Sequence, residues 1–112
     1  MSLAPPCNLH TLPMNANEAW QSFDVATVNG NAVRLRVMQS TAANWHVHEH
    51  SDELFYVLSG MVFIDTEDGT HEMGPGELFV VPSGTRHRAR ADGHASLLVV
   101  DRNNPGLAGD AS

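Results

Sequence analysis

The stretch Trp45-His46-Val47-His48-Glu49-His50-Ser51-Asp52-Glu53 carries the densest chemical information in the chain. Residues two apart on an extended strand point to the same side, so His46 and His48 share a face. The polar residues 49–52 favour a reversal of the chain, which would bring the Glu53 carboxylate beside the two imidazoles. A mixed set of imidazole and carboxylate groups is typical of a site for a divalent metal ion.

A fourth ligand is offered by the segment Arg86-His87-Arg88-Ala89-Arg90-Ala91. On a strand its three arginines fall on one face, and His87 falls on the other with the two alanines. Because arginine side chains belong in solvent, we expect His87 to point inward, with two small side chains leaving space beside it. His50 continues the alternation of His46 and His48 and is an alternative ligand.

These residues resemble the two sequence motifs of the cupin superfamily. The first motif, His-x-His followed by Glu and then Gly, is filled by His46, His48, Glu53 and Gly60. The second, Gly, Pro, Gly and His at fixed spacing, is filled by Gly76, Pro82, Gly84 and His87. Ser40 stands where the first motif has a leading Gly, and Ala91 stands where the second has a closing Asn. The resemblance implies that one divalent metal ion is held by His46, His48, Glu53 and His87, whereas a pair of His48 and His50 would break the motif.

The rest of the chain predicts an all-β fold. Asn29-Gly30 between residues 23–28 and 32–38 is a strong hairpin signal, and in the second segment Val33, Leu35 and Val37 alternate with Arg34 and Arg36 as if one face were buried. Further strands are expected at 45–48, 53–58, 61–66, 70–73, 77–81, 86–90 and 95–100, with turns such as Asp92-Gly93 between them. Residues 17–21 are the only helical candidate. Many short strands favour a sandwich or barrel, and the resemblance implies the cupin-type double-stranded β-helix, a jelly-roll barrel.

One domain is expected from 112 residues. We divide the chain into an N-terminal arm at 1–17, a cupin barrel at 18–101 and a C-terminal tail at 102–112. Residues 54–58, 78–81 and 97–100 are apolar at nearly every position, so some of their outer faces need cover. Small cupins usually pair as dimers and often exchange an N-terminal strand. The resemblance therefore implies a homodimer, in which the extended residues 8–14 are free to take part.

Composition excludes several partners. The net charge is −7, and the six basic residues include no lysine, which argues against binding to nucleic acid. No apolar stretch approaches the ~20 residues that span a bilayer, and the N-terminus lacks the features of a signal peptide, so no membrane partner is expected. The single cysteine, Cys7, cannot form an intrachain disulfide, and a reducing cytoplasm is the simplest location.

Three imidazoles and one carboxylate suit Fe, Mn, Ni, Co, Cu or Zn. Two positions of an octahedron would remain open, where a small molecule carrying two oxygens could chelate. The ion would act as a Lewis acid or as a site for O2. We therefore expect a metal-dependent enzyme of the oxygenase, isomerase or lyase class that acts on a small oxygenated molecule. The alternative is a non-catalytic module that binds or senses a small molecule or sugar, because one fold can host both.

Other residues are less informative. Asp52-Glu53-Leu54-Phe55 and the Gly109-Asp110 ending resemble the small cupins that are compared with mannose-6-phosphate isomerase. No general acid or base stands out, and the candidates for contact with a substrate are Arg36, Gln39, Asn44 and Tyr56. The remaining histidines, His10, His71 and His94, are expected to be ordinary surface or hydrogen-bonded residues.

Overall fold

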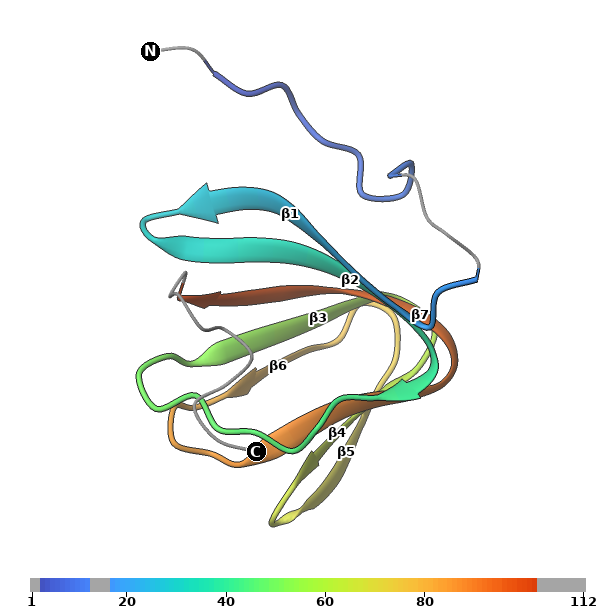
Figure 1. Ribbon diagram of the computed structural model, residues 1–112, viewed down its shortest axis with the longest axis vertical. Helices are drawn as coiled ribbons and strands as arrows, with labels where there is room; N and C mark the ends of the chain where they lie inside the picture. Colours follow the sequence, from blue (N-terminus) through green and yellow to red (C-terminus); the bar gives the residue numbers. More distant parts are fainter. Residues whose placement is uncertain (1–2, 13–16, 103–112) are drawn as a thin grey trace.

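The computed structural model describes residues 3–12 and 17–102, and these residues form seven strands and no helix. The strands are β1 (Trp20–Val28), β2 (Asn31–Ala42), β3 (Glu53–Ser59), β4 (Val62–Thr66), β5 (Gly69–Met73), β6 (Leu78–Val81) and β7 (His87–Arg102) (Figure 1). The all-β prediction is confirmed. Parts of the predicted arm and tail, at 13–16 and at 103–112 with Gly109-Asp110, lie outside the described residues. The described residues contain no helix long and apolar enough to span a membrane.

The long strand β7 joins the two halves of the fold. One antiparallel path runs β1-β2-β7-β3-β6, and β4 pairs with the first residues of β7 while β5 extends β4. Because β7 takes part in both halves, the sheet closes around an apolar interior, as a double-stranded β-helix requires. Figure 1 shows the β4–β5 hairpin diverging from the five-strand path, and residues 3–12 running away from the barrel.

Apolar side chains from most of the strands fill the interior. Phe55 and Val57 of β3 meet Ile64 of β4, and all three are almost completely buried. Each large apolar side chain buried in this way contributes roughly 1.5–3 kcal/mol. The core cluster comprises Met38, Phe55, Val57, Val62, Ile64, Met73, Val81, Ala89, Ala91, Ala95, Leu97 and Val99. This core holds the strand ends that carry the candidate site.

Both sides of β2 carry buried or half-buried residues, whereas the alternation predicts only that one face is buried. Leu35 and Val37 are buried as expected, but they do not belong to the interior cluster. Arg34 and Arg36 point to the other side and line a cavity at the open end of the barrel. The predicted burial of Leu35 and Val37 is confirmed, and the opposite side of β2 contributes to the cavity as well.

Two segments are more extended than predicted. Residues 17–21 are not helical, because Trp20 already begins β1. Residues 87–90 and 95–100 belong to one strand, because Asp92-Gly93 forms an irregularity within β7 rather than a turn. Opposite it, Ser40 has a φ of 46° and its hydroxyl donates a 2.9 Å hydrogen bond to the Asp92 carbonyl. The irregularity is therefore a β-bulge that bends both strands at the junction of the two halves.

Residues 45–48 do not form the predicted strand. They contribute an isolated bridge, in which His46 pairs with His87. The same segment carries two of the candidate ligands, so it is held by that bridge rather than by a continuous ladder.

Candidate metal centre

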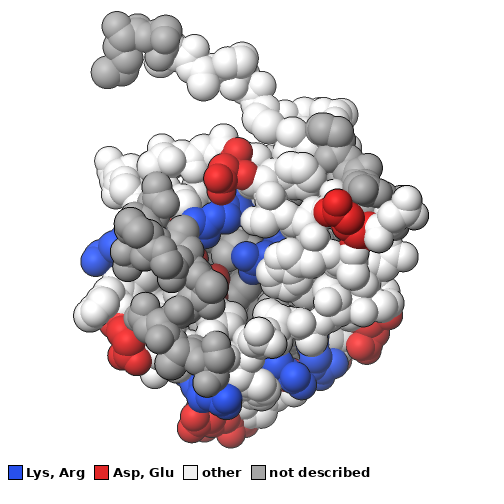
Figure 2. Space-filling model, in the orientation of Figure 1, with Lys and Arg blue, Asp and Glu red and all other residues white. Residues whose placement is uncertain are grey.

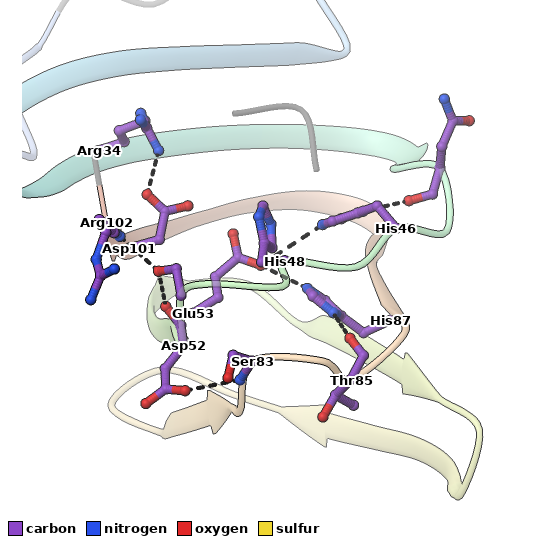
Figure 3. Close-up of polar contacts among 12 residues, drawn as sticks. Arg34, His46, His48, Asp52, Glu53, Ser83, Thr85, His87, Asp101 and Arg102 are labelled. Carbon is purple, nitrogen blue, oxygen red and sulfur yellow. Dashed lines mark hydrogen bonds and ion pairs between the residues drawn. The ribbon is translucent and has the colours of Figure 1, made fainter. Parts of the chain in front are cut away.

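The structure brings His46, His48, Glu53 and His87 together. One ligand atom of each lies within 4.8 Å of the others, close enough to hold a metal ion. The Glu53 Oε1 atom lies 2.7 Å from Nε2 of His87, 3.5 Å from Nε2 of His48 and 3.8 Å from Nε2 of His46. Figure 3 shows the three imidazoles converging on this carboxylate. These four residues are the ones that the sequence predicted.

Backbone pairing explains how distant parts of the chain meet here. Glu53 is the first residue of β3, and His87 is the first residue of β7. The amides of His46 and His87 each donate to the carbonyl of the other at 2.9 Å, which joins the first motif to the second. Gly84 of the second motif donates its amide to the His48 carbonyl at 2.8 Å. The cluster is thus fixed by main-chain contacts, not only by its side chains.

The outer nitrogens of two imidazoles fix their tautomers. Nδ1 of His46 lies 2.7 Å from the Asn44 carbonyl, and Nδ1 of His87 lies 2.8 Å from the Thr85 carbonyl. A carbonyl only accepts, so each Nδ1 carries a proton and donates it. Nε2 of each ring is then the atom available to a metal, which is the usual arrangement of a histidine ligand with its second nitrogen bonded outward.

The carboxylate of Glu53 is held in its ionised form. Burial alone would raise its pKa, because desolvation penalises the charge, but hydrogen bonds with His46, His48 and His87 outweigh burial and hold the pKa of Glu53 well below its usual range. Glu53 Oε1 and His87 Nε2 lie 2.7 Å apart, the distance of a hydrogen bond, and a metal ion bound by both atoms would take the place of the shared proton. An anionic oxygen among three imidazole nitrogens fits a divalent transition-metal ion that is intermediate between hard and soft Lewis acids.

His87 is 1% exposed, and Ala89 and Ala91 of the same face are also buried, as predicted. The three arginines lie on the opposite face as predicted, although Arg88 and Arg90 are only half-exposed because they form ion pairs with Asp65. Glu53 is only 3% exposed, so a cation bound beside it would be shielded from bulk water on the barrel side.

The other histidines lie apart from the cluster. His50 is exposed and lines a separate hollow with Ser51 and Asp52, so the structure does not bring it to the four ligands. His10, His71 and His94 are exposed as well, and His71 stacks on Phe79 with ring centroids 4.7 Å apart.

A cavity of about 500 Å³ opens over the cluster. His46, His48 and Glu53 line its floor, and Phe55 and Ala89 contribute apolar wall. The volume lies in the range of pockets that enclose small organic molecules. The full lining is Trp20, Arg34, Arg36, Thr41, Ala42, Ala43, Asn44, His46, His48, Glu53, Phe55, Ala89 and Asp101.

Of the predicted substrate contacts, Arg36 and Asn44 line the cavity. Gln39 and Tyr56 are not among its lining residues; Gln39 is exposed, and Tyr56 pairs with Leu98 and Leu78 on the outer face of the sheet. Two lining residues were not among the predicted contacts: Trp20, which lies in the segment predicted as a helical turn, and Arg34, which was given no functional role.

Asp101 was also missed, because it follows an apolar strand at the predicted domain boundary. It is buried and accepts a 2.9 Å ion-paired hydrogen bond from Nη1 of Arg34 (Figure 3). Burial raises the pKa of Asp101, and the negative charge of Glu53 adds to this, while the positive charge of Arg34 opposes it. The cavity therefore contains a carboxyl group that can exchange a proton closer to neutral pH than an ordinary aspartate.

Comparison with known proteins agrees with this geometry. Residues 27–101 match the sequence profile of the family described as "Cupin domain". YdbB of Bacillus subtilis is 36% identical over 85 residues, which cover 75% of this chain and 74% of that protein. Quercetin 2,3-dioxygenase of Bacillus subtilis is 35% identical over 54 residues, which cover 48% of this chain and 16% of the enzyme.

Solved structures share the same architecture. TT1209 of Thermus thermophilus superposes with a TM-score of 0.78 at 27% identity, covering 89% of this chain and 98% of that one. A likeness over nearly the whole of both chains supports the double-stranded β-helix described above.

Proposed function

The chain belongs to the cupin domain family, and from this premise we propose that His46, His48, Glu53 and His87 hold one divalent metal ion in a small enzyme acting on an oxygenated molecule. The observation that carries the proposal is the convergence of three Nε2 atoms on an ionised carboxylate at the floor of an open cavity. When bound, such an ion supplies Lewis acidity towards a carbonyl or hydroxyl oxygen, or a site for O2.

An enzyme is favoured over a binding module by the contents of the cavity. Asp101 offers a buried carboxyl group with a raised pKa, which suits proton transfer. Among the candidate classes we rank an oxygenase ahead of an isomerase or lyase, and the similarity to part of quercetin 2,3-dioxygenase supports this order. A sugar stays among the candidate ligands, because of the resemblance to cupins compared with mannose-6-phosphate isomerase.

Metal analysis tests the first part of the proposal. Protein purified without chelators is expected to contain about one divalent ion per chain, and the His46→Ala, His87→Ala double variant is expected to contain none and to lose the thermal stabilisation that a bound ion gives. His71→Ala is the matched control, because His71 is exposed and lies outside the cluster. A double variant that keeps one tightly bound ion would refute the assignment of the site.

Oxygen uptake tests the second part. The metal-loaded protein is assayed for O2 consumption with a panel of 2-hydroxy acids, 2-oxo acids and diketones. Uptake that disappears in Asp101→Asn while the metal content is unchanged would support both an oxygenase and a role for Asp101 in proton transfer. Saturable binding of a panel member without turnover, under aerobic and anaerobic conditions, would favour the non-catalytic alternative.

A further inference from the structure

Arg36 occupies an unusual position in the cavity wall. It projects from β2 beside the candidate metal cluster, and its guanidinium carbon lies 4.5 Å from the centre of the Trp20 ring. Its Nε atom is buried and has no hydrogen-bond partner among the described residues. Burial lowers the pKa of Arg36, but a guanidinium still keeps its proton at neutral pH. The wall of an open cavity therefore contains a positive charge, and the buried Nε atom of the same guanidinium has no hydrogen-bond partner among the described residues.

The neighbouring arginine shows the contrast. Arg34 lines the same cavity, but its charge is compensated by Asp101 at 2.9 Å and by Asp24 at 3.2 Å. The carboxylate of Glu53 influences Arg36 electrostatically, yet its oxygen is already surrounded by three imidazoles. Removing a charge from water without a partner is costly, and the cost is recovered when an anion binds.

We propose that Arg36 binds a carboxylate group of the small molecule that occupies this cavity. The inference rests on the proposed function, in which the same molecule presents oxygen atoms to the metal ion. The ligand is then a small oxyacid, with an anionic end at Arg36 and a hydroxyl or carbonyl end over the cluster.

The shape of the donor favours a carboxylate over a larger anion. A guanidinium is a planar fork that matches the two oxygens of a carboxylate, and stacking on Trp20 fixes the plane of that fork. A phosphate would need further donors, whereas Arg34 beside it is already engaged by two aspartates.

Charge also favours an organic acid. The whole chain has a net charge of −7, so an anion is repelled by most of the surface. Figure 2 shows blue cationic groups within a hollow on this face; Asp101 pairs with Arg34 in the cavity, so Arg36 supplies the cationic charge that an anion would meet. A divalent ion compensated only by Glu53 would add one further positive charge. A monoanion or dianion therefore suits the site.

Calorimetric titration of the metal-loaded full chain tests the inference. The probes are malate, which carries a hydroxyl and two carboxylates, and malamide, its neutral diamide. Arg36→Gln is the test variant, because glutamine removes the charge but keeps a polar side chain. Arg86→Gln is the matched control, because Arg86 also stacks on a tryptophan, at 4.9 Å from the Trp45 ring, but is exposed and does not line the cavity.

The expected result is that Arg36→Gln weakens malate binding by about ten- to a hundredfold, the loss of a hydrogen bond to a charged group, while Arg86→Gln changes it less than twofold. Arg36→Lys, which keeps the charge but not the fork, should recover part of the affinity. Equal binding of malate to wild type and Arg36→Gln would overturn the inference. So would malamide binding as tightly as malate, or no saturable binding of malate at millimolar concentration.

The metal content of each variant separates this test from the proposed function. Arg36 is not a ligand, so Arg36→Gln should retain as much metal as wild type. If wild type itself holds no metal, the metal proposal fails on its own, and the titration is repeated on that protein. A selective loss of malate affinity in Arg36→Gln would still support the anion site, and its absence would refute it.

Discussion

Gly60 allows a quantitative test of the turn that follows β3. Its φ is 77°, in the left-handed region, and a Cβ atom placed on it would lie 2.1 Å from the His94 carbonyl oxygen and 2.8 Å from the Ala95 Cα atom. Both of these are backbone atoms of β7, which cannot rotate away. Gly60→Ala therefore requires either the turn or the long strand to move.

The cost has two parts that a second glycine separates. Gly76 has a similar φ of 85°, but a Cβ atom placed on it would meet nothing within 4 Å. Gly76→Ala should therefore cost only the conformational penalty of about 1 kcal/mol. Gly60→Ala carries the same penalty and adds an overpacking cost of about 1–3 kcal/mol, so we expect a total of about 2–4 kcal/mol.

Urea unfolding followed by tryptophan fluorescence measures both values from the same baseline. The ratio of metal to chain is held constant, or metal is removed from all samples, because bound metal would shift the apparent stability. The reasoning is refuted if the two alanine variants lose the same free energy of unfolding, since the close approach of β7 to Gly60 would then have no energetic consequence.

Ser40 gives a related comparison, because Ser40→Ala and Ser40→Gly both lose the hydrogen bond to Asp92. At a φ of 46° alanine is strained and glycine is not, so the free energy of unfolding should be about 1 kcal/mol higher for Ser40→Gly than for Ser40→Ala in the same urea titration. Asp65 has a pKa well below its usual range, because hydrogen bonds from Arg90, Thr70 and Arg88 outweigh its burial. It should therefore stabilise the fold above about pH 4 and lose this contribution as pH falls further, and Asp65→Asn should flatten the acid side of the stability curve. Metal should dissociate as pH falls below about 6.5, where free histidines become protonated; full occupancy by elemental analysis well below the pKa of a free glutamate would contradict a His and Glu site.

The four clustered residues could be predicted because their spacing follows the motifs, but the reason for their geometry was different. His46 and His48 were expected to share a face of a regular strand. In the structure this segment makes only the bridge to His87, and that bridge determines the position of His46. The spacing in the sequence thus gave the correct cluster through a backbone contact that no local pattern contains.

The cavity wall could not be predicted, because the relevant information is tertiary. Alternation on β2 correctly predicts that Leu35 and Val37 are buried, but it does not say that the opposite set, with Arg34 and Arg36, lines a cavity. Asp92-Gly93 has the composition of a turn, and it becomes a bulge because β2 pairs with β7 on both sides of it.

The outer face of the sheet leads to a last prediction, on assembly. Pairing places Leu35, Leu98, Tyr56 and Leu78 in one row across β2, β7, β3 and β6, and Val33, Val100, Leu54 and Val80 in the next. Antiparallel sheets normally leave one face polar, whereas this sheet is apolar on both. Leu35 is covered by its neighbours at 0% exposure, but Leu78 is 58% and Val80 is 43% exposed at the β6 edge.

We propose that a second copy of the chain covers this face, since two copies of one apolar surface can pair about a twofold axis. Sedimentation equilibrium at micromolar concentration should then give about twice the monomer mass of 12.1 kDa. Leu78→Glu should yield monomers, whereas Met61→Glu, which alters an exposed apolar residue in the turn between β3 and β4, should not. Deletion of residues 1–15 should weaken the dimer if the arm crosses to the partner. A wild-type mass of 12.1 kDa would mean that the exposed leucine and valine at the β6 edge are tolerated in water, and that the apolar composition of this face has another cause.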